Sequence, residues 1–420
     1  MQLPHTAVIG AGIVGVCSAI ELLQRGHRVT IIEPAQVGAE QAASYGNGAW
    51  ISPASIVPMS MPGLWKKIPR YLLDFNSPLT IRWRYLPQLA PWLWHFMWAG
   101  SSKAKVQACA QQLSALLHDS PQRHQALAKA AGVGDLIVQN GLIYAYPNRA
   151  AFESESLAWQ LRTDNGVAWS ELSPAELRRS APALSPRYGF AVRVDQGAHC
   201  LNPRAYVAAL HAYALRLGGV PLNAQATGFV FDGDTLCAVR TRTLSGEHRV
   251  ACTHAVIAAG IASKALALQA GDAVCLESER GYHVELPHAA IDLPTPVMPS
   301  DGKMANTLTQ HGLRAAGQVE LASAAAPPNW ARADGLLKHL QATYSALNTQ
   351  GLKRWMGHRP STPNGLPLIQ ASSRCKQIVF AFGHGHVGLA SAPATAQRVG
   401  DLLAHASSDA GAVNPSGVLR

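Results

Sequence analysis

The residues with the clearest potential for chemistry are three glycines near the start of the sequence and an acid that follows them. Gly10, Gly12 and Gly15 have the spacing GxGxxG, and Glu33 lies about 20 residues further on. In such a pattern one glycine makes a tight turn, one lets the backbone approach a pyrophosphate, and one lets a helix pack closely on a strand. Glu33 can accept both hydroxyl hydrogens of an adenosine ribose, and its charge repels a 2′-phosphate, which argues against NADP. The predicted dinucleotide contacts come from the turn and the acid: Gly10, Gly12, Ile13, Val14, Gly15, Glu33 and Pro34.

The segments around these glycines must place them correctly. The apolar run 6–9 precedes the turn, a helix-like segment ends near Gly26, and a second apolar run covers residues 28–32. This order predicts a βαβ unit whose helix N-terminus offers free amides and a partial positive charge to phosphates. An ordinary strand, turn and helix without a ligand is the alternative.

Two stretches near the end of the sequence also carry chemistry. Residues 357–360 read Gly-His-Arg-Pro, and residues 383–388 read Gly-His-Gly-His-Val-Gly before a long helical pattern. A glycine-rich turn at a helix N-terminus can point amides at an anionic group. His384 and His386 could instead form a metal pair, but no carboxylate or third ligand is nearby in the sequence, so we expect no metal.

Composition narrows the class of protein. The 420 residues are 48% hydrophobic and carry a formal charge of +10, which predicts two domains, or three, and an anionic partner. The basic residues are scattered rather than clustered with aromatic residues, so we expect no nucleic-acid partner. Seven cysteines without a CxxC pair are typical of a reducing compartment, and the sequence enters an apolar strand too early for a signal peptide. We therefore expect a cytoplasmic protein.

The segment 85–98 is rich in tryptophan and is interrupted by two prolines. It is too short to cross a bilayer, which requires about 20 residues. A core helix of a cap domain is the favoured interpretation, and peripheral contact with the inner membrane face is the alternative.

Several elements are expected between these motifs. The patterns predict helices over 101–131, 171–180, 202–217 and 331–348, a hairpin over 229–239, and strands at 141–146, 189–194, 253–260, 282–286 and 313–320.

The motifs together resemble those of FAD-dependent D-amino-acid dehydrogenases, which belong to the wider group of glycine oxidase, sarcosine oxidase and D-amino-acid oxidase. The resemblance runs from about residue 5 to residue 404 and rests on residues 10–33, 44–53, 253–260, 357–365 and 383–388. It implies an α/β and α+β fold, with a Rossmann-like FAD-binding domain and a discontinuous mixed-sheet substrate domain. The expected FAD-binding domain comprises residues 1–80, 200–275 and 355–420, and the substrate domain comprises residues 81–199 and 276–354.

The resemblance also implies the position of the cofactor. The ADP half of FAD would lie on the first glycine turn and Glu33, and the middle of the molecule would lie on the loop of small residues near position 47. FAD is expected to be non-covalent, because Gly357 stands about where sarcosine oxidases carry a flavin-linking cysteine. The further contacts that the resemblance implies are Ser44, Asn47, Gly48, Trp50, Ile51, Gly260, Arg359, Gly383, His384, Gly385, His386, Val387 and Gly388.

The reaction implied by the resemblance is oxidative deamination of a D-amino or imino acid. Hydride passes from the α-carbon to FAD, and water hydrolyses the imine to a 2-oxo acid and ammonia. An arginine or tyrosine must hold the substrate carboxylate. Arg359 is the first candidate and Tyr282 the second, with a salt-bridged arginine and a core tyrosine as the alternatives, and His386 completes the expected catalytic set.

One departure from the family pattern affects the substrate. Many relatives place a carboxylate-binding arginine about where this chain has residues 306–309, and no arginine stands there unless Arg314 replaces it from a shifted register. Cyclic imino acids such as D-proline or hydroxyproline, and N-substituted amines, therefore stay open as substrates. The electron acceptor is expected to be a quinone or another carrier. The alternatives are an O2-using oxidase of glycine, sarcosine or D-proline, and a non-catalytic FAD-binding subunit.

Overall fold

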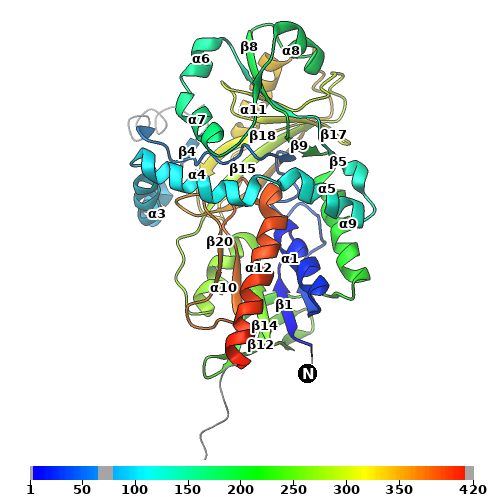
Figure 1. Cartoon of the computed structure of the whole chain (residues 1–420), viewed down its shortest axis with the longest axis vertical. Helices are drawn as coiled ribbons and strands as arrows, with labels where there is room; N and C mark the ends of the chain where they lie inside the picture. The colour runs from blue at the N-terminus through cyan, green and yellow to red at the C-terminus, as the bar shows by residue number, and fades with distance from the viewer. Residues whose placement is uncertain (1–2, 65–78, 412–420) are drawn as a thin grey trace, which may run out of the picture.

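The computed structural model describes residues 3–64 and 79–411, and the lower half of the molecule in Figure 1 is built on a six-stranded sheet. Its strands are β1 (His5–Ile9), β2 (Arg28–Ile32), β10 (Val220–Leu222), β14 (His254–Ile257), β20 (Leu368–Ala371) and β21 (Ile378–Phe382). The spatial order is β10-β2-β1-β14-β21-β20, and the neighbours are parallel except for β20 with β21. β1 and β2 are joined through α1 (Ile13–Gln24), so the predicted βαβ unit is confirmed.

Both faces of the central strands β1, β2, β14 and β21 are covered, which explains why these strands are largely buried without alternation. Val8 packs on one face with α1, α9 (Pro203–Arg216) and α12 (Gly388–Gly411). Ala7 and Ile9 pack on the other face with α10 (Ser263–Gln269) and a three-stranded antiparallel sheet. The strands of that small sheet are β11 (Gln225–Asp232), β12 (Thr235–Thr243) and β13 (Gly246–Ala251), and the first two form the predicted hairpin.

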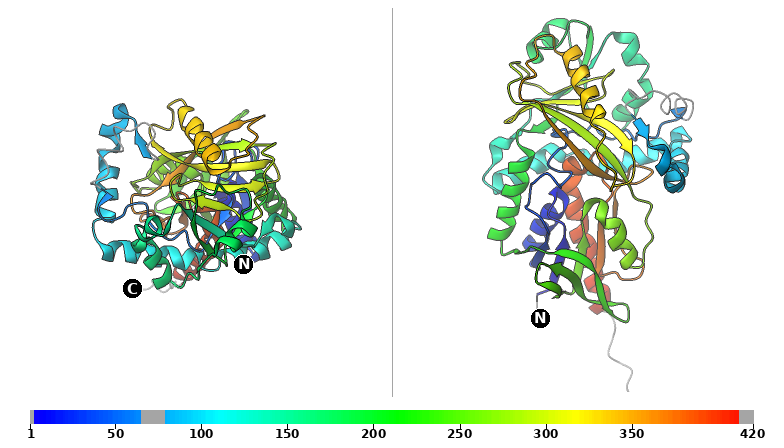
Figure 2. Two further views of the ribbon diagram at one scale, coloured as in Figure 1. Left: turned by 90° about the horizontal axis from the view of Figure 1, so that it is seen from above. Right: turned by 180° about the vertical axis from the view of Figure 1, so that it is seen from behind.

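The upper half of the molecule is a nine-stranded mixed sheet. Its strands are β4 (Leu79–Ile81), β6 (Leu142–Tyr146), β7 (Ser170–Glu171), β8 (Phe190–Val194), β15 (Glu277–Leu286), β16 (Val297–Pro299), β17 (Ala305–Thr309), β18 (Gly312–Leu321) and β19 (Lys353–Ser361). The order is β19-β15-β18-β17-β16-β6-β8-β7, and β4 pairs with β18. In the right view of Figure 2, α11 (Ala331–Thr343) lies across this sheet, where Leu336 and Leu340 enter a core with Val284 and Leu313.

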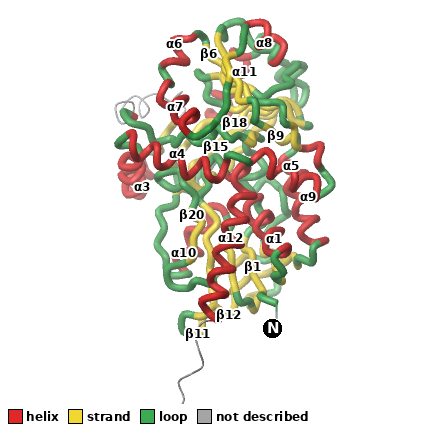
Figure 3. The backbone as a smooth tube through the Cα atoms, in the orientation of Figure 1, coloured by secondary structure: helices red, strands yellow, loops and turns green. Residues whose placement is uncertain are grey.

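Helices fill the sides of the molecule and the space between its halves. In the view of Figure 3, α4 (Lys103–Leu117) and α5 (Ser120–Ala130) cross the middle of the molecule. The shorter elements are α6 (Arg149–Glu153), α7 (Ser156–Asp164), α8 (Pro174–Ser180), the 3-10 turns Trp83–Tyr85, Gly134–Leu136 and Gly260–Ala262, and the strands β3 (Trp50–Ile51), β5 (Ile137–Val138) and β9 (Ala198–Cys200).

Two predicted helices differ from the structure. The helix expected over 101–131 is interrupted between α4 and α5, because Pro121 in the first turn of α5 disfavours a continuous helix before it. The helix expected to reach residue 348 ends at Thr343, because Tyr344 is extended and bridges Leu184.

The other predicted helices and the fold class are confirmed. α8 starts with the capping box of Ser173 and Glu176, and Asn202 caps α9 by accepting the amide of Ala205. The Rossmann-like sheet with a mixed second sheet agrees with the expected class. The division into domains stays a prediction, and β19 runs through the expected boundary near residue 355.

Candidate FAD and substrate site

The first glycine turn has the shape that a pyrophosphate requires. Gly10 has a φ of +102°, and a Cβ atom there would collide with the carbonyl group of Ala258. A Cβ atom on Gly15 would collide with the carbonyl oxygen of Gly10, so α1 can approach β1 only because this residue is glycine. Gly12 differs, since a Cβ atom there would meet only the hydroxyl oxygen of Ser44, 3.4 Å away. Gly12 supplies no side-chain cap to α1, although the Ser44 hydroxyl accepts the Ile13 amide. The space beside Gly12 at this helix N-terminus therefore fits a phosphate group.

Glu33 lies at the end of β2 and faces this turn. Its Oε2 atom accepts the Ala11 amide at 2.9 Å, and its Oε1 atom accepts the Ala35 amide at 3.2 Å. Both bonds fix the half-buried carboxylate beside the glycine turn. This is the position from which an acid reaches the ribose of a dinucleotide.

We expect Glu33→Ala to weaken FAD binding by about tenfold to a hundredfold, because hydrogen bonds to a charged acceptor contribute about 1.5–3 kcal/mol. Titration of the apoprotein with FAD, followed by flavin fluorescence, measures this change. Glu40→Ala is the control, since Glu40 is exposed and lies outside the turn. Equal affinities of the two variants would contradict the role of Glu33.

The loop around Asn47 connects the glycine turn to the nine-stranded sheet. Ser44 accepts the amide of Ile13 at 3.0 Å through its hydroxyl oxygen, and Asn47 accepts the amide of Ala49 at 2.6 Å. Thr307 on β17 donates to the carbonyl oxygen of Gly48 at 2.9 Å and accepts from the Trp50 indole at 3.0 Å. The loop residues predicted to contact FAD therefore lie between the first turn and the second sheet, with Trp50 and Ile51 in β3.

The C-terminal turn lies between β21 and α12. Gly383 and Gly385 have φ values of +84° and +51°, and the Gly385 amide donates to the Pro360 carbonyl at 2.8 Å. The turn therefore packs against the end of β19. Val387 is buried and Gly388 begins α12, whereas Gly260 begins a 3-10 turn after β14.

The two histidine side chains of this turn lie in different environments. His384 is buried, and its Nε2 atom lies 3.0 Å from the hydroxyl of Thr395. His386 lines a cavity to which its side chain is exposed, and the surrounding protein and the charge of Arg359 lower its pKa. Both rings are therefore neutral at pH 7. No group of three His, Cys, Asp or Glu side chains suited to a metal occurs among residues 3–64 and 79–411.

Burial lowers the pKa of His384 to about 3, below the ordinary value of 6.5. The unfolded chain therefore binds this proton more readily, so the stabilisation is complete above pH 6.5 and is lost as the pH falls towards 3. We expect this side chain alone to lower the free energy of unfolding by about 2 kcal/mol between pH 7 and pH 5. Urea unfolding at both pH values should show a smaller decrease for His384→Gln than for the wild type.

The control for this measurement is His118→Gln, because the His118 side chain is 60% exposed. It should reproduce the wild-type pH dependence. An unchanged pH dependence in His384→Gln would contradict the assignment.

Arg359 lies on the same face of β19 as Trp355, whose ring lies against Gly46 of the loop around Asn47. Its Nη1 and Nη2 atoms donate to the carbonyl oxygens of Gln318 at 2.9 Å and Gly317 at 3.3 Å. A Cβ atom on Gly281 would occupy the space of the guanidinium, so this glycine makes room for the charge. The side chain is held on two backbone carbonyls and keeps further N–H donors for a ligand.

Tyr282 is on the opposite face of β15 from Arg359. Its ring is fully buried under α11, and its hydroxyl donates to Glu320 at 2.5 Å and accepts the Asn329 amide at 2.9 Å. Since neighbouring residues of a strand point to opposite faces, Gly281 faces Arg359 and Tyr282 does not. The structure therefore does not bring the two carboxylate-binding candidates together.

Arg314 does not take the place of the family arginine that is absent near residue 308. It forms an ion pair with Glu285 at 2.9 Å and donates to the carbonyl oxygens of Tyr45 and Asn47. This guanidinium is buried and ties β18 to the loop around Asn47. Arg359 is thus the arginine of the predicted set that adjoins the cavity residues.

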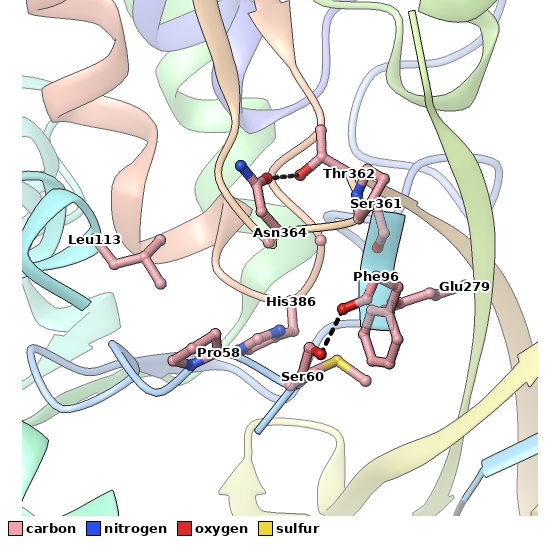
Figure 4. A pocket seen from close by; sticks show the side chains of 13 residues that line it. Pro58, Ser60, Phe96, Leu113, Glu279, Ser361, Thr362, Asn364 and His386 are labelled. Carbon is pink, nitrogen blue, oxygen red and sulfur yellow. Dashed lines mark hydrogen bonds between the residues drawn. The ribbon is translucent and has the colours of Figure 1, made fainter. Parts of the chain in front are cut away.

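A small cavity of about 20 Å³, enough for about one water molecule, lies between the C-terminal turn, β15 and the helices at the side of the molecule (Figure 4). Its wall is apolar on the side of α3 (Leu86–Ala99) and α4, and polar near the ends of β15 and β19. The lining residues are Pro58, Met59, Ser60, Phe96, Leu113, Glu279, Ser361, Thr362, Pro363, Asn364, Gly365, Gly385 and His386.

Glu279 was not among the predicted site residues. It is 4% exposed, and it pairs in register with Arg359 on the neighbouring strand. β15 starts at residue 277, five residues before the predicted start at residue 282. With the observed start, the alternation of side chains places Glu279 and Gly281 on one face, and this pattern was the signal in the sequence.

Comparisons with known proteins agree with this geometry. Residues 5–402 match the family described as FAD dependent oxidoreductase (DAO). The D-amino-acid oxidase of Bradyrhizobium diazoefficiens is 48% identical over 403 residues, which cover 95% of this chain and 94% of that protein. The D-amino acid dehydrogenase of Paramagnetospirillum magneticum is 26% identical over 418 residues, with 94% of both chains covered.

Among solved structures, the glycine oxidase of Bacillus cereus superposes with a TM-score of 0.69 at 18% identity, covering 96% of this chain and 95% of that one. The likeness extends over both sheets of the fold. The predicted resemblance is therefore confirmed, and the chain belongs to the family of FAD-dependent oxidoreductases that is represented by D-amino-acid oxidase.

Proposed function

We propose that this protein oxidises a D-amino or imino acid at the α-carbon and that Arg359 binds the substrate carboxylate. The observation that carries the proposal is the position of Arg359, next to Glu279 at the polar wall of the cavity and close to the C-terminal glycine turn. The relatives named above support the substrate class. FAD is bound without a covalent link, since Gly357 offers no thiol.

The chain contributes binding and orientation to this reaction. Bound FAD supplies the hydride acceptor. Arg359 would fix the carboxylate through charge-assisted hydrogen bonds. The α-carbon would then be held at one distance from the cofactor, with one of its faces directed towards it. His386, Met59 and the buried ring of Phe96 line the cavity in which we place the substrate.

The proposal is tested by anaerobic reduction of the flavin. D-Amino acids, D-proline, D-hydroxyproline, glycine and sarcosine are added singly to the purified yellow protein, and the flavin band is followed. Bleaching by a D-substrate and not by its L-enantiomer is the expected result. Bound flavin that no amine reduces would overturn the proposal and favour a non-catalytic FAD-binding subunit.

Oxygen is the acceptor that the 48% identical relative suggests, because that protein is named an oxidase. Substrate oxidation should then consume one O2 per turnover without an added carrier. Oxygen consumption in an electrode cell, compared with reduction of an artificial dye, measures the preference directly.

A carrier at a membrane is the second candidate, and the outer face of α3 and of the 3-10 turn before it favours it. The helix lies at the side of the molecule in both views of Figure 2, and Trp83, Trp94 and Trp98 are 60%, 71% and 62% exposed. Exposed tryptophans near basic residues such as Lys105 suit an anionic membrane surface. No helix within the described part of the chain is long and apolar enough to span a bilayer. Sedimentation with anionic vesicles, lost in the double variant Trp94→Ser/Trp98→Ser, would support this acceptor, whereas no sedimentation would contradict it.

A further inference from the structure

Glu279 differs from the other buried acids of the nine-stranded sheet because no cation from the described part of the chain is in direct contact with it. Glu277 pairs with Lys264 at 2.7 Å, Glu285 pairs with Arg314 at 2.9 Å, and Glu320 pairs with Arg82 at 2.7 Å. Within residues 3–64 and 79–411, Glu279 forms no such ion pair, although it is 4% exposed and borders the cavity. Its carboxylate receives a hydrogen bond from Ser361 and the more distant charge of Arg359.

The strand register places this acid beside the arginine that is proposed to bind the carboxylate. Glu279 is opposite Arg359 in the antiparallel pair of β15 and β19, so both side chains leave the sheet on the same face. The site thus presents one negative and one positive group next to each other. An amino or imino acid carries the complementary pair of charges, a carboxylate and an ammonium, on one carbon atom.

We propose that Glu279 is a catalytic residue that binds the ammonium group of the substrate and accepts its proton before the α-carbon is oxidised. The inference rests on the proposed function. A buried carboxylate without a cation is costly to keep ionised, and a substrate ammonium would supply the missing cation.

The proton transfer also frees the lone pair of the substrate nitrogen for the oxidation step. One N–H bond of the ammonium breaks, its proton forms an O–H bond with Glu279, and the electron pair of the N–H bond stays on nitrogen. Once the α-carbon gives up hydride to the acceptor that bound FAD would supply, this lone pair forms the C=N bond, and the product is an iminium ion. Two electrons leave the substrate with the hydride, so charge and atoms balance.

The surroundings of Glu279 suit a proton acceptor. Burial raises the pKa of its carboxyl group, while the charge of Arg359 and the Ser361 hydrogen bond oppose that shift. The charged and titratable groups that border it are Arg359 on β19, His386 after β21, and Glu277 two residues earlier on β15. The pKa of His386 is lowered, so its ring is neutral at pH 7, and Glu277 is paired with Lys264.

The first test uses binding to the holoenzyme and does not depend on turnover. 2-Aminoisobutyrate is a zwitterion without an α-hydrogen, and isobutyrate is the same acid without the amine. Their dissociation constants are measured from the perturbation of the flavin absorbance. Glu279→Gln should raise the dissociation constant of 2-aminoisobutyrate at least thirtyfold. The dissociation constant of isobutyrate should stay within threefold of the wild-type value. Glu277→Gln, on the same strand, should change neither constant.

The second test is the pH profile of kcat/KM with a D-substrate. At pH 7 Glu279→Gln should be about a hundredfold slower than the wild type, and the deficit should shrink about tenfold per pH unit as free amine becomes available. Glu279→Asp should restore part of the pH 7 activity, because a carboxylate is present again.

The outcomes separate the inference from the proposed function. Equal weakening of both ligands in Glu279→Gln would show that Glu279 only supports Arg359, and unchanged affinities would also overturn the inference. If no amine reduces the wild-type flavin but 2-aminoisobutyrate binding depends on Glu279, the proposed function fails while the ammonium site stands.

Discussion

Arg359→Ala is expected to lower kcat/KM for the best D-substrate about a thousandfold while FAD stays bound. The variant removes the charge that holds the carboxylate and leaves the buried acid Glu279 without its neighbouring cation. Removal of the arginine from the buried charge pair that it would form with the substrate carboxylate costs about 4 kcal/mol, which corresponds to that factor. Steady-state kinetics together with the flavin absorbance of the purified variant measure both parts of the prediction.

Two further variants define the role of this arginine. Arg354→Ala removes an exposed arginine of the same strand, which pairs with Asp334 at 2.6 Å, and should leave kcat/KM within twofold. Arg359→Lys should recover only part of the rate, because lysine lacks the planar fork that reaches Gln318, Gly317 and a ligand together. A normal rate in Arg359→Ala would refute the assignment of the carboxylate site.

Gly15→Ala should abolish FAD binding and destabilise the apoprotein by about 3 kcal/mol, because the added methyl group collides with the carbonyl oxygen of Gly10 and overpacks the contact between α1 and β1. Gly12→Ala separates the two effects. Its methyl group has space in the apoprotein, so folding should be nearly normal while FAD affinity falls. Thermal unfolding of both apoproteins and FAD titration provide the measurements.

Gly335→Ala is the matched control for these glycines. Gly335 lies within α11, and no atom lies within 4 Å of an added Cβ atom. Alanine should therefore stabilise this helix by up to about 1 kcal/mol and leave FAD binding unchanged. Normal FAD binding by Gly15→Ala would contradict the proposal that position 15 must be glycine for α1 to pack closely on β1.

The sequence was informative where structure depends on neighbours in the chain. The βαβ unit is confirmed because its turn, helix and strand follow one another, and the cap of α8 is local in the same way. The helix α3 is also formed despite Pro91, since one side contributes Leu89, Trp92 and Phe96 to a core while the other is exposed. The two expectations for this segment, a core helix and a surface helix, thus describe opposite sides of one element.

The substrate side was harder to predict because it depends on pairing between distant strands. Residues 277–281 contain two glutamates and an arginine, so they do not resemble a strand until β18 and β19 bury them. The missed start of β15 concealed that Glu279 and Arg359 share a face. It also concealed that Tyr282 faces α11.

The order of strands in the first sheet has a consequence for biosynthesis. β1 pairs with β14 (residues 254–257), and β14 pairs with β21 (residues 378–382). The C-terminal helix α12 packs along α1. On a ribosome, the N-terminal glycine turn emerges long before these neighbours exist, so its half of the sheet has an unpaired edge during translation. We therefore expect FAD to bind only after the C-terminal strands have completed the sheet.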